Sequence, residues 1–380
     1  MEENERNRAW ASTMAGHLAP DGRQLAHSDS AAGAGLHQRG DIRREEREAN
    51  EDAELAAAAT RARDGGDRLR TEDADPLRTC FERDRDRILH SASFRRLAGK
   101  TQVFVFPDDH QRTRLTHALE VAQVATAAAR ALRLNVALAE AIALGHDCGH
   151  GPGGHASEDA FSPFLHDGFD HATWGADVTL AGLNLCRETL DGIRNHSWSR
   201  PAPSSPEGEV VSWADRIAYV CHDLEDAVAA GVVTYAQVPD IVKERCGPTR
   251  SSQLRSFISA LVDGSSAGGP IGMLAPQAEA LAALRAFNYE RVYLRPASTA
   301  QGAAVVKVLR ALVEHHADRP NVLPSFDGGE ARSRRGMAAG SDEARHEAVA
   351  YVAGMTDRFA FAQAVSLLGW DPSELPVGVR

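Results

Sequence analysis

Cysteines are few in this sequence, and none stand in a CxxC pair. The 380 residues include five, spread from Cys80 to Cys246. An odd number of isolated cysteines favours reduced thiols in a cytosol over a disulfide framework. We therefore expect a cytoplasmic protein whose stability depends on a packed core rather than on cross-links.

The sequence also lacks long apolar runs and the common nucleotide-binding signatures. No run approaches the roughly 18 apolar residues that span a bilayer, and the charged beginning MEENERNRAW has no apolar segment typical of a signal peptide. We thus expect no membrane partner. GxxxxGK[ST] is missing, so the signature of a P-loop NTPase is absent, and no GxGxxG follows a predicted strand, as the signature of a Rossmann dehydrogenase requires. The net charge of −11 argues against a surface built mainly to bind nucleic acid or anionic lipid, but it leaves room for a local basic pocket.

Aromatic and β-branched residues are nearly absent from residues 1–70, which are rich in Ala, Gly, Arg, Glu and Asp. Such a segment buries too little apolar surface to offset the entropy lost on ordering. We expect a mobile or partly helical arm here, with a helix within residues 42–63, where charges mix with alanines. The rest is long enough for a large core. We divide it into a core over 71–230 and a C-terminal helical part over 231–380 that packs on this core.

Apolar residues recur at helical spacing through most of the chain after residue 80. We therefore expect an all-α, mostly helical fold with little or no β structure. A short β-rich stretch at TQVFVFP, ended by Pro107, is the one exception. The predicted helices cover residues 82–97, 112–132, 135–147, 210–231, 251–264, 277–294, 303–320 and 344–369.

Imidazoles and carboxylates gather in the stretch ALGHDCGHGPGGHASEDAF. His146 and Asp147 are adjacent, and His150, His155 and Glu158 follow among glycines and a proline. Adjacent residues on a helix point about 100° apart, so the first two share one target only near a helix end or through a compact ion. Imidazole nitrogen and carboxylate oxygen together suit iron, manganese, zinc or, more weakly, magnesium. The alternative is a polar helix end that runs into a glycine-rich loop.

Two further features favour a site over that alternative. His117 lies in the first turns of a predicted helix, and a short turn would pack this helix antiparallel to the next one and bring His117 close to His146. Asp215, Tyr219 and Asp223 stand at i, i+4 and i+8, so they form one stripe on a later helix. A solvated helix face is the alternative interpretation of this stripe.

The order H…HD…D over three helices resembles the HD superfamily of metal-dependent phosphohydrolases. Five blocks sharpen the likeness: FERDRDRILHSASFRRLAGKTQVF, RTRLTHALEVAQVA, GHDCGHGPGGHASEDAF, WADRIAYVCHDLEDA and YVAGMTDRFA. From about Asp75 to the C-terminus they are similar to the bacterial deoxyguanosine triphosphate triphosphohydrolase (dGTPase) family. The resemblance implies an HD-domain helical core with additional helices. It also implies hydrolysis of dNTPs, dGTP foremost, to a deoxynucleoside and inorganic triphosphate.

The resemblance implies a role for each residue of the site. A divalent metal (magnesium, manganese or iron) would be held by His117, His146, Asp147 and Asp215. The catalytic residues at the attacked phosphorus would be His155, Glu158 and His150. Phosphates would be bound by Arg114 and Arg216, and the deoxyribose by Tyr219 and Asp223.

Partners and substrate class follow from the resemblance less directly. It implies a dNTP substrate and a homo-oligomer, and a single-stranded DNA or nucleotide effector is a further candidate partner. Many family members carry an Asn-Glu-Gln run after a Phe-x-His, where this chain has Ala172, Thr173 and Trp174; this departure leaves the base preference open. The alternatives are an HD-domain nucleotidase or phosphodiesterase of another nucleotide class, and a non-catalytic regulator that binds a nucleotide or a single strand.

Overall fold

The computed structural model describes residues 5–13, 16–30, 42–63, 65–266, 268–323 and 337–376. The chain forms two compact units, Met1–Ile42 and Arg43–Arg380. In the first unit, helix α1 (Glu5–Thr13) precedes a short antiparallel pair of strands, β1 (His17–Leu18) and β2 (Gln24–Leu25).

The second unit is helical and confirms the mostly α-helical fold predicted from the sequence. In the described part of this unit, the only β pairing consists of two isolated bridges, Arg68 with Cys186 and Thr101 with Thr113. Its α-helices are α2 (Arg44–Glu54), α3 (Cys80–His90), α4 (Ala92–Arg96), α5 (Arg114–Ala131), α6 (Val136–Gly145), α7 (Ala156–Phe161), α8 (His171–Trp174), α9 (Arg187–Arg194), α10 (Pro206–Ala229), α11 (Asp240–Cys246), α12 (Arg250–Ser266), α13 (Ala275–Asn288), α14 (Pro296–Ala317), α15 (Asp342–Ala353) and α16 (Asp357–Leu368).

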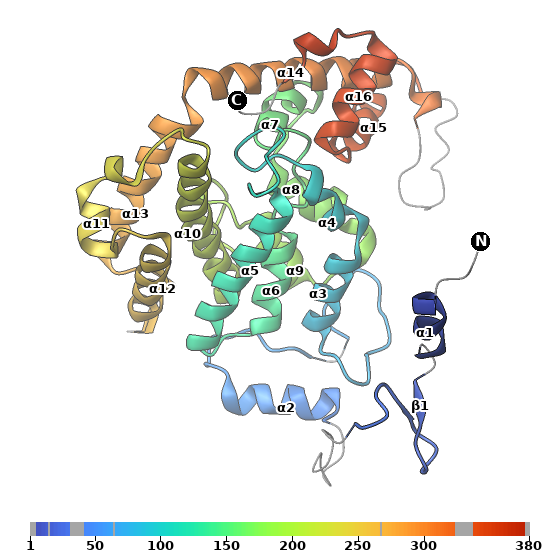
Figure 1. Ribbon diagram of the computed structural model, residues 1–380, viewed down its shortest axis with the longest axis vertical. Helices are drawn as coiled ribbons and strands as arrows, with labels where there is room; N and C mark the ends of the chain where they lie inside the picture. Colours follow the sequence, from blue (N-terminus) through green and yellow to red (C-terminus); the bar gives the residue numbers. More distant parts are fainter. Residues whose placement is uncertain are drawn as a thin grey trace. The chain divides into compact units, whose positions relative to one another are not determined.

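The main hydrophobic core lies between α3, α5, α6 and α10, which pack side by side (Figure 1). Small side chains let these helices approach closely: Ala118, Ala125 and Ala128 of α5 are fully buried. The side chain of Asn135 caps α6 by accepting from the Leu138 amide. Each buried leucine or isoleucine of α6 contributes roughly 1.5 to 3 kcal/mol relative to an exposed one, so this core fixes the helix ends that carry the polar cluster.

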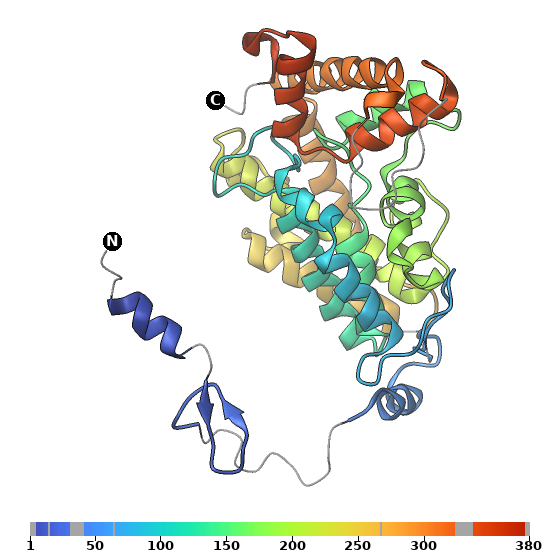
Figure 2. The same ribbon diagram turned by 90° about the vertical axis from the view of Figure 1, so that its right-hand side faces the viewer.

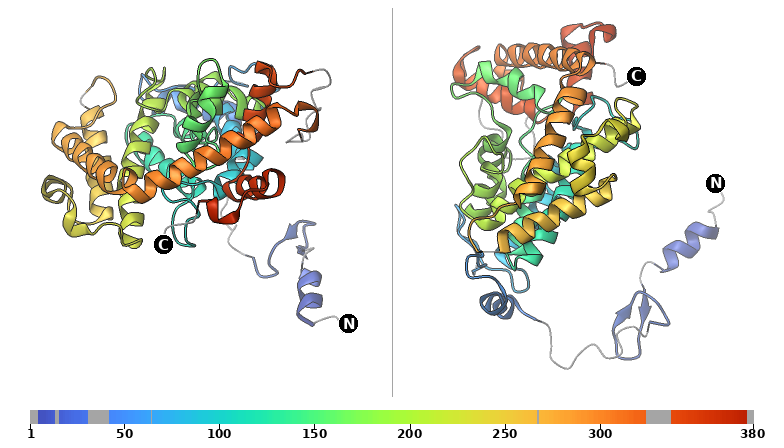
Figure 3. Two further views of the ribbon diagram at one scale, coloured as in Figure 1. Left: turned by 90° about the horizontal axis from the view of Figure 1, so that it is seen from above. Right: turned by 90° about the vertical axis from the view of Figure 1, so that its left-hand side faces the viewer.

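A second core joins the C-terminal helices to α7. Figure 2 shows α14, α15 and α16 gathered at one end of the unit, and their apolar side chains pack with those of α7 and the residues that follow it. The preceding helix α13 packs instead on α11 and α12, whereas α14 reaches α15 and α16 (Figure 3). The glycine-rich loop between α6 and α7 therefore connects one core to the other.

Residues 43–70 bond to the helical core through buried polar groups. The Glu207 carboxylate accepts hydrogen bonds from the Thr60 amide and hydroxyl at 3.0 and 2.7 Å. Arg68 pairs with Asp84 at 2.6 Å, and both side chains are buried. The helix predicted within residues 42–63 is present as α2, while the division predicted at residues 70 and 230 stays a prediction.

Three local predictions were wrong. The single helix predicted over residues 344–369 is divided into α15, which ends at Ala353, and α16, which begins at Asp357 after the cap residue Thr356. The helix predicted over residues 82–97 is interrupted at Ser91, whose hydroxyl accepts from the Phe94 amide and starts α4. The stretch TQVFVFP forms no strand, because only Thr101 makes a bridge and Phe106 has a left-handed backbone with φ 52°. Phe104 and Val105 are instead buried in the two cores. None of the helices in the described ranges is long and apolar enough to cross a bilayer.

Candidate active site

Three helices bring four candidate metal ligands together. His117 lies in the first turns of α5, His146 and Asp147 follow the last residue of α6, and Asp215 lies in the middle of α10. Nε2 of His117 is 3.0 Å from Oδ1 of Asp215, and Nε2 of His146 is 3.6 Å from the same oxygen. Nε2 of His146 is 3.4 Å from Oδ1 of Asp147, and Nε2 of His117 is 3.9 Å from Oδ2 of that residue.

The donor set suits a divalent cation. Ligand atoms that each lie about 2.1 Å from one ion are separated by roughly 3 to 4 Å from one another, and the four distances fall in this range. Nδ1 of His146 donates to the Ala143 carbonyl at 2.7 Å, which leaves the lone pair on Nε2. This Nε2 is buried and has no hydrogen-bond partner. An ion between the side chains would supply the missing partner.

The electrostatics of the cluster also favour a cation. Burial alone would lower the pKa of His146, but the carboxylates of Asp147 and Asp215 outweigh it and raise the pKa to about 9. Burial opposes ionisation of Asp147, yet Arg114 and His146 hold its pKa well below the ordinary value. The pKa of Asp215 is likewise held well below its ordinary value by His117 and His146, against the effect of burial. Both carboxylates are therefore ionised and attract positive charge.

Arg114 presents unpaired donors beside the cluster. Its Nη1 donates to Oδ2 of Asp147 at 2.6 Å, and the side chain is almost fully buried. The Nε and Nη2 atoms are buried and have no hydrogen-bond partner. Nη2 approaches Gly154, where an added Cβ would lie 2.7 Å away. A buried guanidinium with two unused donors suits an anionic oxygen such as a phosphoryl oxygen.

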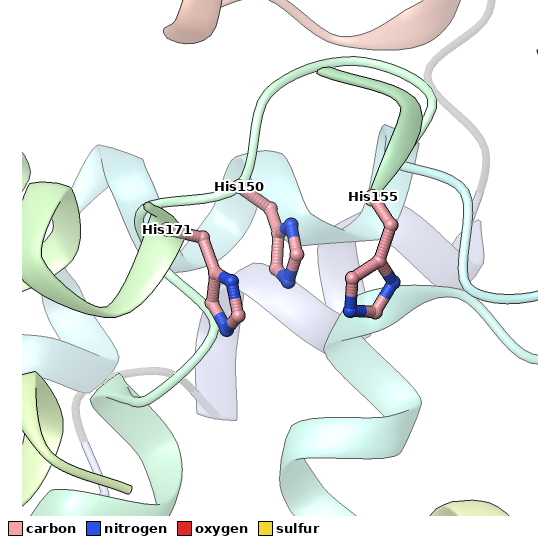
Figure 4. A group of neighbouring side chains, drawn as sticks. All are labelled: His150, His155 and His171. Carbon is pink, nitrogen blue, oxygen red and sulfur yellow. The ribbon is translucent and has the colours of Figure 1, made fainter. Parts of the chain in front are cut away.

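Three histidines line the glycine-rich loop next to this cluster (Figure 4). The donor atoms of His150, His155 and His171 lie within 4.8 Å of one another. The rings of His150 and His171 are stacked, with centroids 3.7 Å apart and planes 13° apart. Because the lone pair of an imidazole nitrogen lies in the ring plane, two stacked rings direct their lone pairs along parallel planes. The rings of His150 and His171 are therefore poorly oriented for binding one ion together.

Glu158 pairs with His171. Its Oε1 accepts from the His171 amide at 3.2 Å and contacts Nδ1 of the same ring. Burial raises the pKa of Glu158, but His171 outweighs it and lowers the pKa to about 2. Nε2 of His171 lies 3.2 Å from Nε2 of His196, whose Nδ1 donates to the Ile193 carbonyl. Glu158, which the motif GHxxE suggests as a partner for His155, instead holds His171.

The sequence interpretation missed His171 and His196. His171 begins α8, and His196 follows α9, so each comes from an element with no metal-binding pattern of its own. A donor atom of His196 lies within 4.8 Å of donors of His146 and Asp147. The only signal for His171 was its place in the Phe-x-His motif, and no signal pointed to His196.

The polar stripe of α10 faces α13 and the turn that follows it. Tyr219 accepts a hydrogen bond from Nε of Arg285 at 2.8 Å, and Tyr293 donates to Oδ2 of Asp223 at 2.6 Å. Oδ1 of Asp223 is buried without a partner. The guanidinium of Arg216 lies 3.5 Å above the centre of the Trp198 ring. The stripe is therefore part of a half-buried polar wall and is not a solvated helix face.

Ionisation of Asp223 is expected to weaken folding as the pH rises. Burial raises the pKa of this carboxyl to about 7, above its ordinary value of 3.8. A raised carboxyl pKa makes the folded state most favourable below pH 3.8, and this stability is lost as the pH rises to 7. The unfolding free energy of metal-free Asp223→Asn minus that of the native chain should therefore rise with pH. We expect this difference to be about 2 to 3 kcal/mol larger at pH 8 than at pH 5.

Denaturant unfolding of both proteins at the two pH values measures this difference. The exposed Asp342→Asn, whose side chain is 98% accessible, is the control and should show no such gain. An equal stability difference at pH 5 and pH 8 for Asp223→Asn would contradict the prediction.

Comparisons with known proteins agree with this geometry. Residues 114–220 match the HD domain, and residues 271–365 match the phosphohydrolase-associated domain. A deoxyguanosinetriphosphate triphosphohydrolase-like protein of Caldanaerobacter subterraneus is 39% identical over 314 residues, covering 80% of this chain and 90% of the relative. A protein of Desulfatibacillum aliphaticivorans with the same description is 39% identical, and the match covers 78% of this chain and 89% of the relative. A third, from Syntrophus aciditrophicus, is 35% identical, and the match covers 83% of this chain and 94% of the relative.

The HD-domain match includes all four candidate ligands. The fold and the site thus define an HD-domain metal-dependent phosphohydrolase. Within this class, the chain belongs to the deoxyguanosinetriphosphate triphosphohydrolase-like family, since relatives above one third identity cover most of both chains.

Proposed function

We propose that the protein is a dNTP triphosphohydrolase that cleaves dGTP to deoxyguanosine and inorganic triphosphate. The observation that carries this proposal is the position of the Arg114 guanidinium. It pairs with the candidate ligand Asp147 while two of its buried donors stay unused. A phosphoryl oxygen bound to these donors would lie beside the cation site, where hydrolysis requires it.

The candidate ligands would be His117, His146, Asp147 and Asp215, and the cation magnesium, manganese or iron. When bound, such a cation would lower the pKa of a coordinated water and polarise a phosphoryl oxygen. Arg114 would neutralise charge on the triphosphate. Arg216, whose guanidinium lies over Trp198 and whose buried Nε has no hydrogen-bond partner, would be the second phosphate-binding arginine.

His155 would move the proton. Attack of water at the α-phosphorus breaks the bond to the 5′-oxygen, and that oxygen must then be protonated. Although part of the His155 side chain is exposed, the surrounding protein desolvates the ring and, together with Arg114, lowers its pKa to about 4. The ring is therefore neutral at pH 7 and able to accept the proton of the attacking water, which it would then pass to the leaving 5′-oxygen. Glu158 would act by holding His171, which in turn stacks on His150.

The α10 stripe would hold the sugar. Tyr219 and Asp223 would receive the deoxyribose, and the unpartnered Oδ1 of Asp223 would accept a hydrogen bond from a sugar hydroxyl. Arg285 and Tyr293, which bond to these two residues, would fix their orientation. The preference for guanine, the homo-oligomeric state, a nucleotide or single-strand effector and a cytoplasmic location stay predictions.

Product analysis tests the proposal. Purified protein with manganese or magnesium and dGTP should release deoxyguanosine and triphosphate in equal amounts, seen by ion-exchange chromatography. In H2¹⁸O the label should appear in the triphosphate, because water attacks phosphorus and not the 5′-carbon. Orthophosphate released from a deoxynucleoside monophosphate, with dGTP untouched, would assign the protein to another nucleotide class. Nucleotide binding without turnover would favour a regulator.

A further inference from the structure

Two sequence blocks that the proposed chemistry does not use meet behind the catalytic loop. The first is the GKTQVF segment with Lys100 and Thr101, and the second is the junction between α15 and α16 in YVAGMTDRFA. Lys100, Thr101 and Asp357 are all buried polar residues. Buried polar groups cost free energy unless they are bonded, so their partners indicate what they hold.

Lys100 connects the loop to the end of α15. Its Nζ donates to the carbonyl oxygen of His150 and, at 2.9 Å, to that of Ala353. The side chain is only 3% exposed, so water does not replace these contacts. One ammonium group therefore bridges the backbone of a proposed catalytic histidine and the last residue of a C-terminal helix.

Asp357 makes a second connection from the start of α16. Its Oδ2 accepts from the Thr101 amide at 3.0 Å and from the Thr101 hydroxyl at 2.5 Å. Its Oδ1 accepts from the Gly153 amide at 2.9 Å. All three partners are donors, so an ionised carboxylate satisfies them and an amide group does not.

Two glycines also lie in close contact with residues of the C-terminal part. Gly153 has a left-handed backbone with φ 73°, and a Cβ there would lie 2.4 Å from Cγ1 of Val305 on α14. A Cβ on Gly99 would lie 2.8 Å from Cγ2 of Thr356. The loop thus rests on α14 at Gly153, and the segment before Lys100 rests on the α15–α16 junction at Gly99, with no room for an added methyl group at either glycine.

We propose that Asp357 and Lys100 are positioning residues through which the C-terminal helices α14–α16 hold the loop of residues 150–155 in its catalytic geometry. This inference rests on the proposed function, because His150 and His155 matter only if this site is catalytic. A glycine-rich loop has many conformations to lose on ordering. Backbone bonds restrict it at His150, before its two consecutive left-handed glycines, and at Gly153, the first of this pair.

Asp357→Asn tests the inference at constant size. The amide would place an N–H against the Gly153 amide or against the donors of Thr101. The hydrogen bonds of Asp357 to one of these two residues would therefore be lost. Misplacement of a reacting group by about 1 Å lowers the rate roughly 100-fold. We expect kcat for dGTP to fall between about 10- and 100-fold, with KM and the metal content per chain within twofold of the native values. Hydrogen exchange at the amides of Gly151 and of residues 153–155 should accelerate.

Asp342→Asn is the matched control. Asp342 also occupies the first position of a C-terminal helix after a hydroxyl cap, but it is exposed and its ion pair is with Arg345 on the same helix. This variant should keep native kcat and native exchange in the loop. Thr101→Val removes one of the three donors to Asp357 and should give a smaller loss of kcat, about threefold, with a smaller rise in exchange.

The outcomes separate this inference from the proposed function. A folded Asp357→Asn protein with native kcat and native exchange in residues 151–155 would overturn the positioning role. If Asp357→Asn does not fold, native kcat and native exchange in Thr101→Val would overturn it instead. If the native protein hydrolyses no dNTP, the proposed function fails. The exchange measurement would then still show whether Asp357 holds the loop.

Discussion

Replacing His146 with alanine is expected to abolish both metal binding and dNTP hydrolysis. His146 supplies the unpartnered, fully buried Nε2 at the centre of the four candidate ligands. A bound cation contributes several kcal/mol to phosphoryl transfer, and each 1.4 kcal/mol is tenfold in rate. We therefore expect kcat/KM for dGTP to fall at least about 1000-fold, and the metal content measured by mass spectrometry to fall with it.

His166→Ala is the control for this variant. His166 is exposed and its ring bonds only to its neighbour Asp167 among the contacts of the described residues, so metal and activity should stay native. Full metal content with native turnover in His146→Ala would refute the assignment of this ligand. Loss of metal with unchanged nucleotide affinity and no native turnover would instead favour a binding protein.

His155→Ala is expected to separate proton transfer from metal binding. The ring of His155 faces His150, with centroids 4.9 Å apart, and it is not one of the four candidate ligands (Figure 4). Loss of a positioned acid or base lowers a rate by typically 10²- to 10⁴-fold. We expect a fall in kcat of about this size, with metal content unchanged and KM for dGTP little changed.

The pH profile of the native enzyme provides the comparison for His155→Ala. The variant should lose any dependence of kcat on protonation of this imidazole, while His166→Ala keeps the native profile. If His155→Ala loses metal together with activity, the residue binds the cation and the proton-transfer role is wrong.

The helical architecture could be predicted because its signals are local. Apolar spacing marks the helices of the core, and the order of His117, His146, Asp147 and Asp215 marks the superfamily. In the structure, the imidazole nitrogens of the two histidines lie 3.0 to 3.9 Å from carboxylate oxygens of the two aspartates. Helix periodicity and a short connection between α5 and α6 were enough to anticipate that His117 and His146 approach one another.

What could not be predicted depends on contacts between distant segments. His171 and His196 enter the site through tertiary packing. Only the Phe-x-His motif marks His171, and no pattern around His196 separates it from an ordinary histidine. Composition likewise suggested a solvated segment before residue 70. The buried bond of Thr60 to Glu207 and the Arg68–Asp84 pair cannot be read from composition, because a buried glutamate and an exposed one look alike in sequence.

The C-terminal third illustrates the same limit. Its helices were predicted from periodicity, but their relation to the catalytic loop appears only in the bonds of Lys100 and Asp357. The match of residues 271–365 to a phosphohydrolase-associated domain is consistent with a part that accompanies the HD core. We infer that the two parts act as one catalytic unit.

The most direct measurement is anomalous diffraction at the manganese edge from crystals soaked with manganese and a non-hydrolysable dGTP analogue. We predict one strong peak bounded by His117, His146, Asp147 and Asp215. The α-phosphate should lie between this ion and His155, with an oxygen on the free donors of Arg114. A peak among His150, His155 and His171 with none at the four ligands would contradict it.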